Sequence, residues 1–411
     1  MLVVIFGAGA SFDSDPRRTP HDSGLTPPPN HAHRPPLANE LFEMTGDVHK
    51  EVAAEFPRAW GALMRCSQDV RAGLGIEAAL QAMQDQSSDD PDLRAQLTAV
   101  RFYLQRVLTR TPHLWHEEAV GQTAYVSLLD QLRAWSRVVN QPLCLITFNY
   151  DVLLERAVEA VFGHEITTFE GYTAHRNVHV FKPHGSVNWS YRFPFDTYDS
   201  GERLKRGDDA RRLIINSDPE DATVNSDASE LVWRAPNDQP LEAGGQGQTM
   251  AYLPAMAIPV ERKPGLVMPE ELRQAMIQDL QQATSVITIG WRAAEQHFLD
   301  VLQKNLPKGL GLHVVTKGSD AAKATATALW ETGRFTKYTL HDRGFAPFAR
   351  WEISRYPDDV AKRTSALQDS VGTVGRLLRG QVKPVESNPA FDQIVHRQEQ
   401  LDTERAPYQL F

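Results

Sequence analysis

Two residues of this 411-residue chain carry side chains that together suit acid–base chemistry on a positioned water, Asn149 and His184. An amide can hold a nucleophile by hydrogen bonds, and a neutral imidazole, with an ordinary pKa of about 6.5, can accept its proton. Asp151 stands two residues beyond Asn149 and can orient its neighbours, although capping of a following helix is its commoner use. Asn149 as a helix cap and His184 as a packed turn residue are the competing structural interpretations.

A third feature is the turn Gly7-Ala8-Gly9, because backbone without side chains lets a diphosphate approach closely. Alone it indicates little, since many structural turns contain two glycines. The sequence departs from the dehydrogenase pattern at Phe12, where a third glycine is expected. Seven prolines in residues 16–36 also exclude the second strand with an acidic end that such enzymes use. A hydride-transferring dehydrogenase is therefore disfavoured.

Short apolar runs rich in β-branched residues predict the strands that position these groups. They lie at residues 2–6, 142–147, 178–182, 256–260, 286–289, 312–316 and 338–340. Helical patterns alternate with the later runs, for example over residues 269–282, 293–303 and 321–330. This alternation predicts an α/β fold, a Rossmann-like, doubly wound and mostly parallel sheet. In such sheets ligands bind beyond the carboxyl ends of the strands, where the polar groups at Gly7, Asn149, His184 and Gly290 all fall.

The remaining segments predict insertions into one large domain over residues 1–345. Residues 37–135 show helical periodicity and predict a helical insertion, whose stripe from Leu97 to Val107 suits a core or an oligomer interface. Residues 195–250 are polar and predict an irregular insertion with one hairpin. Residues 346–411 predict a helical C-terminal region, a place for assembly contacts.

Composition excludes several classes of protein. A formal net charge of −9 argues against direct nucleic-acid binding. No apolar stretch reaches the roughly 18 residues of a membrane span. Two cysteines, Cys66 and Cys144, cannot build a disulfide framework or a four-thiolate zinc site, and the histidines lack partners at ligand spacing. We expect a cytoplasmic protein without a membrane segment or a bound metal.

The chain resembles the sirtuin family in three linked segments, and most of all its bacterial antiphage-defence branch, whose members hydrolyse NAD. The segments are Gly7-Ala8-Gly9-Ala10-Ser11, Thr147-Phe148-Asn149-Tyr150-Asp151 and Lys182-Pro183-His184-Gly185-Ser186. Their order, spacing and strand context all match over residues 1–345. The resemblance implies that Asn149 holds a water or the nicotinamide ribose, and that His184 contacts the ribose hydroxyls and acts as base.

The resemblance also implies which residues bind NAD, the substrate. They are Gly7, Ala8, Gly9, Ser11, Asp13, Thr147, Gly290 and Trp291, with residues 13–36 as a loop over the nicotinamide end. At Trp291 the match is loose, since the family has a small hydroxyl residue after the glycine. Protein-deacetylating sirtuins usually carry two Cys-x-x-Cys pairs, which are absent here, so hydrolysis of NAD itself is favoured.

The expected activity is thus that of an NAD glycohydrolase, a homo-oligomeric effector that depletes NAD during phage infection. Two alternatives stay open: a non-catalytic NAD or ADP-ribose sensor that regulates a partner ATPase or nuclease, and a zinc-free deacylase. By analogy with the family, a ring-forming ATPase or an Argonaute-like protein is the expected partner.

Overall fold

The computed structural model describes residues 1–14, 33–42, 47–195, 210–217, 229–243, 249–257 and 266–353. By its contacts the chain divides into two units, Met1–Pro357 and Asp358–Phe411, and all that follows concerns the first. The expected loop over residues 13–36 and the C-terminal region from residue 346 lie largely outside the described residues, so their assigned roles stay predictions.

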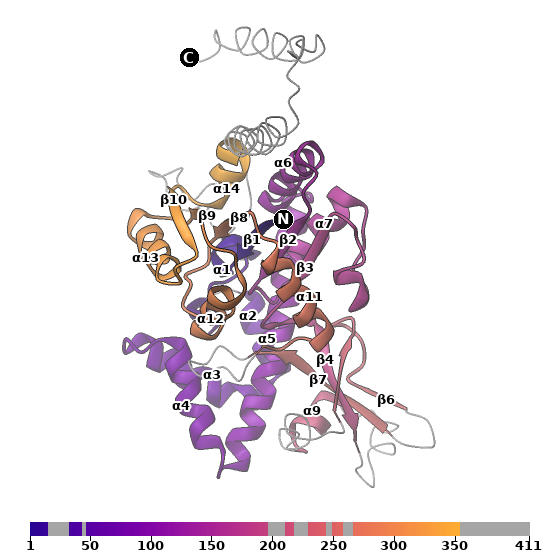
Figure 1. The fold of residues 1–411 in the computed structure, drawn as a ribbon. Helices are drawn as coiled ribbons and strands as arrows, with labels where there is room; N and C mark the ends of the chain where they lie inside the picture. Colours follow the sequence, from indigo (N-terminus) through magenta and orange to yellow (C-terminus); the bar gives the residue numbers. More distant parts are fainter. Residues whose placement is uncertain are drawn as a thin grey trace, which may run out of the picture. The chain divides into compact units, whose positions relative to one another are not determined.

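A six-stranded parallel sheet forms the centre of the first unit (Figure 1). Its strands are β1 (Leu2–Phe6), β2 (Leu143–Thr147), β3 (Val178–Phe181), β8 (Ser285–Ile289), β9 (Leu310–Val315) and β10 (Phe335–His341). They lie in the order β10-β9-β8-β1-β2-β3, and every neighbouring pair is parallel. Numbered along the chain, this is the 3-2-1-4-5-6 order of the Rossmann fold, which confirms the predicted fold class. All five residues of β1 are fully buried, as expected of a strand covered on both faces.

Helices connect these strands much as the sequence predicts. They are α1 (Ala8–Phe12), α6 (Ala124–Val139), α7 (Leu153–Phe162), α11 (Glu270–Gln281), α12 (Gln296–Asn305), α13 (Ser319–Trp330), α14 (Phe345–Pro347) and the short turns η4 (Glu170–Tyr172) and η6 (Phe348–Glu352). The helix α12 begins three residues later than the expected residue 293. Ala293 has a φ of 53°, a left-handed conformation that a right-handed helix cannot include.

The helical insertion is confirmed between β1 and β2. It comprises η2 (Asn39–Phe42), α2 (Asp47–Glu55), η3 (Pro57–Ala59), α3 (Trp60–Arg71), α4 (Ile76–Ser87) and α5 (Pro91–Glu118), and α6 completes it. Asp90 caps α5, because its Oδ1 accepts from the N–H groups of Asp92 at 3.0 Å and Leu93 at 3.1 Å. With a capped start and 28 residues, α5 is the longest described helix of the insertion.

The region that follows His184 is more regular than predicted. It forms an antiparallel sheet of β4 (Gly185–Pro194), β5 (Glu230–Trp233), β6 (Leu241–Ala243) and β7 (Thr249–Met256), in the order β5-β4-β7-β6, with the helix α9 (Ala210–Ile215). The strands β6 and β7 form one hairpin, and much of the rest of the expected insertion over residues 195–250 lies outside the described residues, so its irregular character stays a prediction. The strand expected over residues 256–260 ends as β7 at Met256, and residues 258–260 lie outside the described part.

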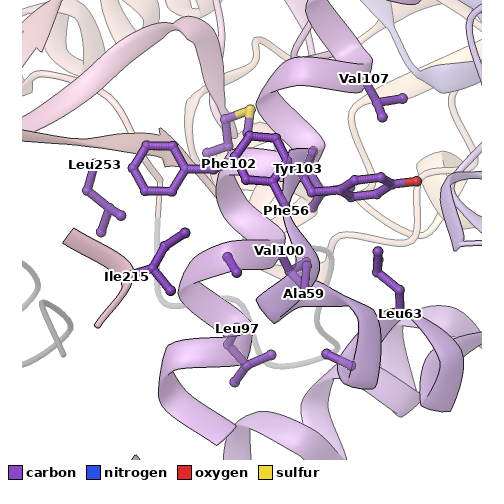
Figure 2. Packing of buried hydrophobic residues seen from close by; sticks show 14 of the residues in the cluster. Phe56, Ala59, Leu63, Leu97, Val100, Phe102, Tyr103, Val107, Ile215 and Leu253 are labelled. Carbon is purple, nitrogen blue, oxygen red and sulfur yellow. The ribbon is translucent and has the colours of Figure 1, made fainter. Parts of the chain in front are cut away.

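A second hydrophobic core joins the insertion to the antiparallel sheet (Figure 2). The predicted stripe on α5 is part of this core, and Figure 2 labels Leu97, Val100, Tyr103 and Val107 among its side chains. Polar bonds add to this packing, since Gln105 Nε2 on α5 donates to the carbonyl of Val187 on β4 at 2.8 Å. The insertion is thus fixed against the strand that begins at the His184 turn.

Within the described part of the chain, the helices are too short or too polar to cross a membrane. Both cysteines are buried with free thiols: Cys144 lies in β2, and the Cys66 Sγ contacts the Met83 Sδ at 3.4 Å.

Candidate functional site

The reversal of strand order in the parallel sheet lies between β1 and β8. From β1 the chain adds strands on one side (β2, β3), and from β8 on the other (β9, β10). The loops after β1 and β8 therefore leave the sheet in divergent directions, and this is where open α/β sheets bind their ligands. Gly7 and Gly290 are the first residues of these two loops, and Asn149 follows the neighbouring β2.

The glycines of these loops pack against one another. Gly9 N donates to the Gly290 carbonyl at 3.1 Å, and a Cβ on Gly7 would lie 2.6 Å from the same oxygen. A Cβ on Gly290, whose φ is +59°, would lie 2.8 Å from the Gly9 Cα. Close contact between the two backbones therefore explains why Gly7, Gly9 and Gly290 lack side chains. The predicted approach of a diphosphate to Gly7, Ala8 and Gly9 stays a proposal.

Three of the predicted site residues meet in one hydrogen-bonded cluster. The Asn149 Nδ2 donates to the Ser11 Oγ at 2.8 Å, and the Ser11 Oγ donates to the Asp151 Oδ2 at 2.8 Å. Tyr125, from α6, completes it: its hydroxyl lies 3.0 Å from the Ser11 Oγ and accepts from the Asn149 Nδ2 at 3.1 Å. We call Ser11, Tyr125, Asn149 and Asp151 the amide cluster. Each of the four is buried, with 1–7% of its surface exposed.

The side chain that bonds to the start of α7 belongs to Asp151 rather than to Asn149, and the N-cap residue itself is Val152. The Asp151 Oδ1 accepts from the Leu153 N–H at 3.0 Å, at the first residue of the helix. The side-chain nitrogen of Asn149 instead points to α1 and α6 through Ser11 and Tyr125. Thr147, predicted to contact NAD, uses its Oγ1 to accept from the Asn149 N–H at 3.1 Å. Thr147 and Asp151 thus shape the turn that carries Asn149.

A buried ion pair lies beneath this turn. Lys182 is fully buried, and its Nζ donates to the Glu155 Oε1 at 2.8 Å and to the main-chain carbonyls of Tyr150, at 3.4 Å, and Asp151. A buried ammonium needs such partners, because desolvation without them is costly. Lys182 directly follows β3 and precedes Pro183, so it links the Asn149 turn to the His184 turn.

His184 lies among aromatic rings. Its ring meets Phe148 edge-on at a centroid distance of 4.7 Å and lies nearly parallel to Tyr150 at 6.4 Å. These two residues flank Asn149 in the sequence, so His184 packs against the turn that presents the amide. A second histidine, His297 on α12, lies 6.2 Å from His184 between ring centroids. His184 is 2% exposed, and its main-chain carbonyl accepts from the Ala257 N–H at 2.8 Å.

Trp291 belongs to the same set of rings. It stacks on Phe148 at 5.2 Å with an interplanar angle of 9°, meets Phe298 edge-on at 5.8 Å, and is 3% exposed. Its Nε1 donates to the Glu295 Oε2 at 2.7 Å. We call Phe148, His184, Trp291 and Phe298 the ring cluster. Packing explains the large side chain at position 291, where the family resemblance implies a small one in contact with the adenosine side.

Asp13, at the end of α1, is turned toward the main chain of α14. Its Oδ2 accepts from the N–H groups of Phe345 at 2.8 Å and Ala346 at 3.4 Å. Burial raises the pKa of Asp13 to about 6, and the two backbone hydrogen bonds oppose that rise. The predicted contact of Asp13 with NAD stays a proposal.

Sequence reasoning missed Tyr125, Glu155 and His297. Tyr125 lies on a helix in the insertion, where an aromatic residue usually signals a core. Lys182 carried one signal, since it stands within the recognised Lys-Pro-His-Gly-Ser segment.

Other features of the described residues lie apart from this site. A cavity of about 340 Å³ is lined by residues of η3 and α9, among them Arg58, Arg211 and Arg212, and by none of the predicted site residues. No group of three or more His, Cys, Asp or Glu side chains within the described ranges is placed to hold a metal ion. His179 bonds to Asp279 at 2.7 Å, and the His164 Nε2 lies 2.7 Å from the Gly171 carbonyl, so these histidines have structural partners.

No model of a protein family matches this chain, and no curated protein matches its sequence. Solved structures do. One is a mutant Sir2 homologue in complex with ADP ribose, with 14% identity, a TM-score of 0.35, and coverage of 88% of this chain and 93% of that one. Another Sir2 homologue, in complex with 2'-O-acetyl ADP ribose, has 14% identity, a TM-score of 0.34, and coverage of 87% and 92%. The chain is similar to these Sir2 homologues, and its Rossmann-like class rests on its own strand order.

Proposed function

We propose that this chain is an NAD glycohydrolase, which cleaves the bond between nicotinamide and ribose and releases ADP-ribose. The observation that carries the proposal is the amide cluster, together with His184, beside the strand reversal of a Rossmann-like sheet. In this proposal NAD binds at the strand reversal between β1 and β8, where open α/β sheets take their ligands, and Asn149 and His184, which follow β2 and β3, supply an amide and an imidazole. These are the groups that hydrolysis of this bond requires.

The proposed chemistry balances without further groups. Breakage of the bond between C1′ and the pyridinium nitrogen leaves the electron pair on nitrogen, so nicotinamide departs neutral, and positive charge develops on the ribose. Asn149 holds a water at C1′, whose oxygen forms the new bond. His184 takes the proton that this water loses and returns it to solvent.

The biological role that we propose follows from the family resemblance. Hydrolysis without an acceptor would deplete NAD, which suits a cytoplasmic effector of bacterial antiphage defence. Assembly as a homo-oligomer, and with a ring-forming ATPase or an Argonaute-like partner, belongs to the same proposal. Expression in bacteria challenged with phage, with cellular NAD measured over time, tests it against the Asn149→Ala chain.

The biochemical test is release of nicotinamide from NAD by the purified full-length chain, alone and with extract from phage-infected cells. Asn149→Ala and His184→Ala should each reduce the rate by about 100-fold or more. Asn305→Ala and His113→Ala are matched controls, since neither residue belongs to the amide cluster or the ring cluster: Asn305 is the last residue of α12, and His113 is exposed on α5. Both should keep the wild-type rate, and melting curves should show that all four variants fold.

Each alternative has its own outcome. Absence of nicotinamide release in every preparation, with NAD still bound, would favour the sensor. Release in a fixed ratio to an added acylated peptide would favour the deacylase. Either result would overturn the glycohydrolase proposal.

A further inference from the structure

The hydrogen bonds of the amide cluster have a direction that elementary chemistry fixes. A serine hydroxyl has one hydrogen, and Ser11 gives it to the Asp151 carboxylate at 2.8 Å. The contact of 3.0 Å between the Ser11 and Tyr125 oxygens therefore needs a hydrogen from Tyr125. The Tyr125 hydroxyl donates its single hydrogen to Ser11. Toward Asn149 it can therefore act only as an acceptor.

This direction determines which way round the Asn149 amide lies. Its nitrogen donates one hydrogen to Ser11 at 2.8 Å and the other to Tyr125 at 3.1 Å. An amide turned by 180° would place its carbonyl oxygen against two oxygens whose hydrogens are already committed. The nitrogen end is thus held inside the cluster, and the carbonyl oxygen of Asn149 is the end left to accept from a ligand.

We infer that Tyr125, from the helical insertion, is a positioning residue that fixes the Asn149 amide with its carbonyl oxygen toward the reacting water or ribose hydroxyl. The inference rests on the proposed function for the identity of that ligand. A carbonyl in this position can accept a hydrogen from water and keep a lone pair of the water oxygen directed at C1′.

The surroundings of Tyr125 suit this task. The side chain is 1% exposed, and its ring packs on Phe6 at 5.3 Å and on Phe345 at 5.2 Å between centroids. Burial, with the nearby Asp151 charge, raises the pKa of Tyr125 well above its ordinary value, so the phenol keeps its proton and stays a donor. The ring position is set by packing, and the hydroxyl remains to orient the amide.

The variant Tyr125→Phe separates the packing of the ring from the orienting role of the hydroxyl. It keeps the ring and removes the oxygen, so the Asn149 amide loses one acceptor and can rotate. We expect the kcat for nicotinamide release to fall about tenfold or more, with KM for NAD changed less than about twofold.

Tyr103→Phe is the matched control. Tyr103 is fully buried in the insertion, and its hydroxyl donates to the Leu41 carbonyl at 3.0 Å. Each substitution deletes one buried hydroxyl, so both should lower the melting temperature by similar amounts. Only Tyr125→Phe should lower kcat. Equal kcat in the two variants would overturn the inference.

A double-mutant comparison gives a second readout. Ser11→Ala and Tyr125→Phe act on the same amide, so their effects on kcat should not add: the double variant should be little slower than the slower single one. If the fold-reductions in kcat of the two single variants multiply in the double variant, the two residues act independently. That result would overturn a shared role in positioning the Asn149 amide.

A third readout does not depend on activity, so it separates failure of the inference from failure of the proposed function. In full-length chain labelled with 15N asparagine, the Asn149 side-chain signal is identified by its loss in Asn149→Ala. Its two amide hydrogens should exchange slowly in the wild type and in Tyr103→Phe, and at least tenfold faster in Tyr125→Phe. Unchanged exchange in Tyr125→Phe would overturn the inference even if wild type hydrolyses NAD. Faster exchange would support it even if wild type does not.

Discussion

The two proposed catalytic side chains lie in surroundings of opposite kinds. Asn149 is held in the amide cluster by hydrogen bonds, each with a donor and an acceptor that cannot be exchanged. His184 packs against Phe148 of the ring cluster and against Tyr150 and His297 outside it, and these contacts between rings have no donor and acceptor. Hydrogen bonds fix an orientation, whereas ring packing fixes a position and a shape. Substitutions in the amide cluster should therefore disturb the orientation of a side chain, whereas substitutions in the ring cluster should disturb packing.

The largest expected effect concerns the ion pair beneath the amide cluster. Lys182→Met removes the ammonium and leaves the Glu155 carboxylate buried, with 8% of its side chain exposed and no counter-charge from Lys182. We expect the free energy of unfolding to fall by about 3–5 kcal/mol, measured by urea denaturation. The paired variant Lys182→Met with Glu155→Leu should recover most of this loss, because no buried charge is left. Equal stability of the single variant and the wild type would contradict the structural role of the pair.

The next effect concerns Asp13 and depends on pH. Burial raises the pKa of Asp13 from 3.8 to about 6, so the folded state holds this proton more tightly than the unfolded state. Ionisation therefore costs stability, beginning as pH rises above about 4 and complete above about 6. Asp13→Asn cannot ionise and avoids this cost.

The measurement for Asp13 is the difference in unfolding free energy between Asp13→Asn and the wild type at pH 4.5, 6 and 7.5. The difference should shift in favour of the variant by about 2 kcal/mol over this range. A difference that is independent of pH would show that the carboxyl group titrates alike in both states.

The smallest effect distinguishes packing from ligand contact in the ring cluster. Trp291→Phe keeps a ring against Phe148 and removes the hydrogen bond from Nε1 to Glu295. We expect a loss of about 1 kcal/mol in unfolding free energy and an unchanged KM for NAD. A KM raised fivefold or more, without a larger loss of stability, would instead support the predicted contact between Trp291 and the cofactor.

The parallel sheet could be predicted because its strands carry their own signal. Apolar, β-branched runs such as residues 2–6 and 286–289 are buried on both faces, and neither needs a distant partner to be recognised. The strand β4 was missed although its apolar residues alternate with polar ones, as in a half-buried strand, because it follows the recognised turn without a break. Its partner β7 begins about 60 residues later, at Thr249.

The candidate site was predictable only in part, for a related reason. Ser11, Asn149 and Asp151 stand in recognisable segments after strands, and the parallel sheet places such segments at one edge. Tyr125 reaches the same point from a helix, 114 residues from Ser11 and 24 from Asn149. Nothing in its local pattern distinguishes it from a core aromatic residue. Lys182 was not singled out as a buried charge, because its neutralising partner Glu155 lies on another element.

The contact between Gly7, Gly9 and Gly290 sets a limit on how this fold can be redesigned. A side chain at any one of the three would meet main-chain atoms of the opposite loop, and main chain cannot be trimmed by a second substitution. A protein usually accepts a larger residue when a second substitution makes a neighbouring side chain smaller. No such compensating substitution is available at these positions. Attempts to enlarge the crevice for a bulkier dinucleotide analogue must alter the side chains around the strand reversal and retain the glycine triplet as a unit.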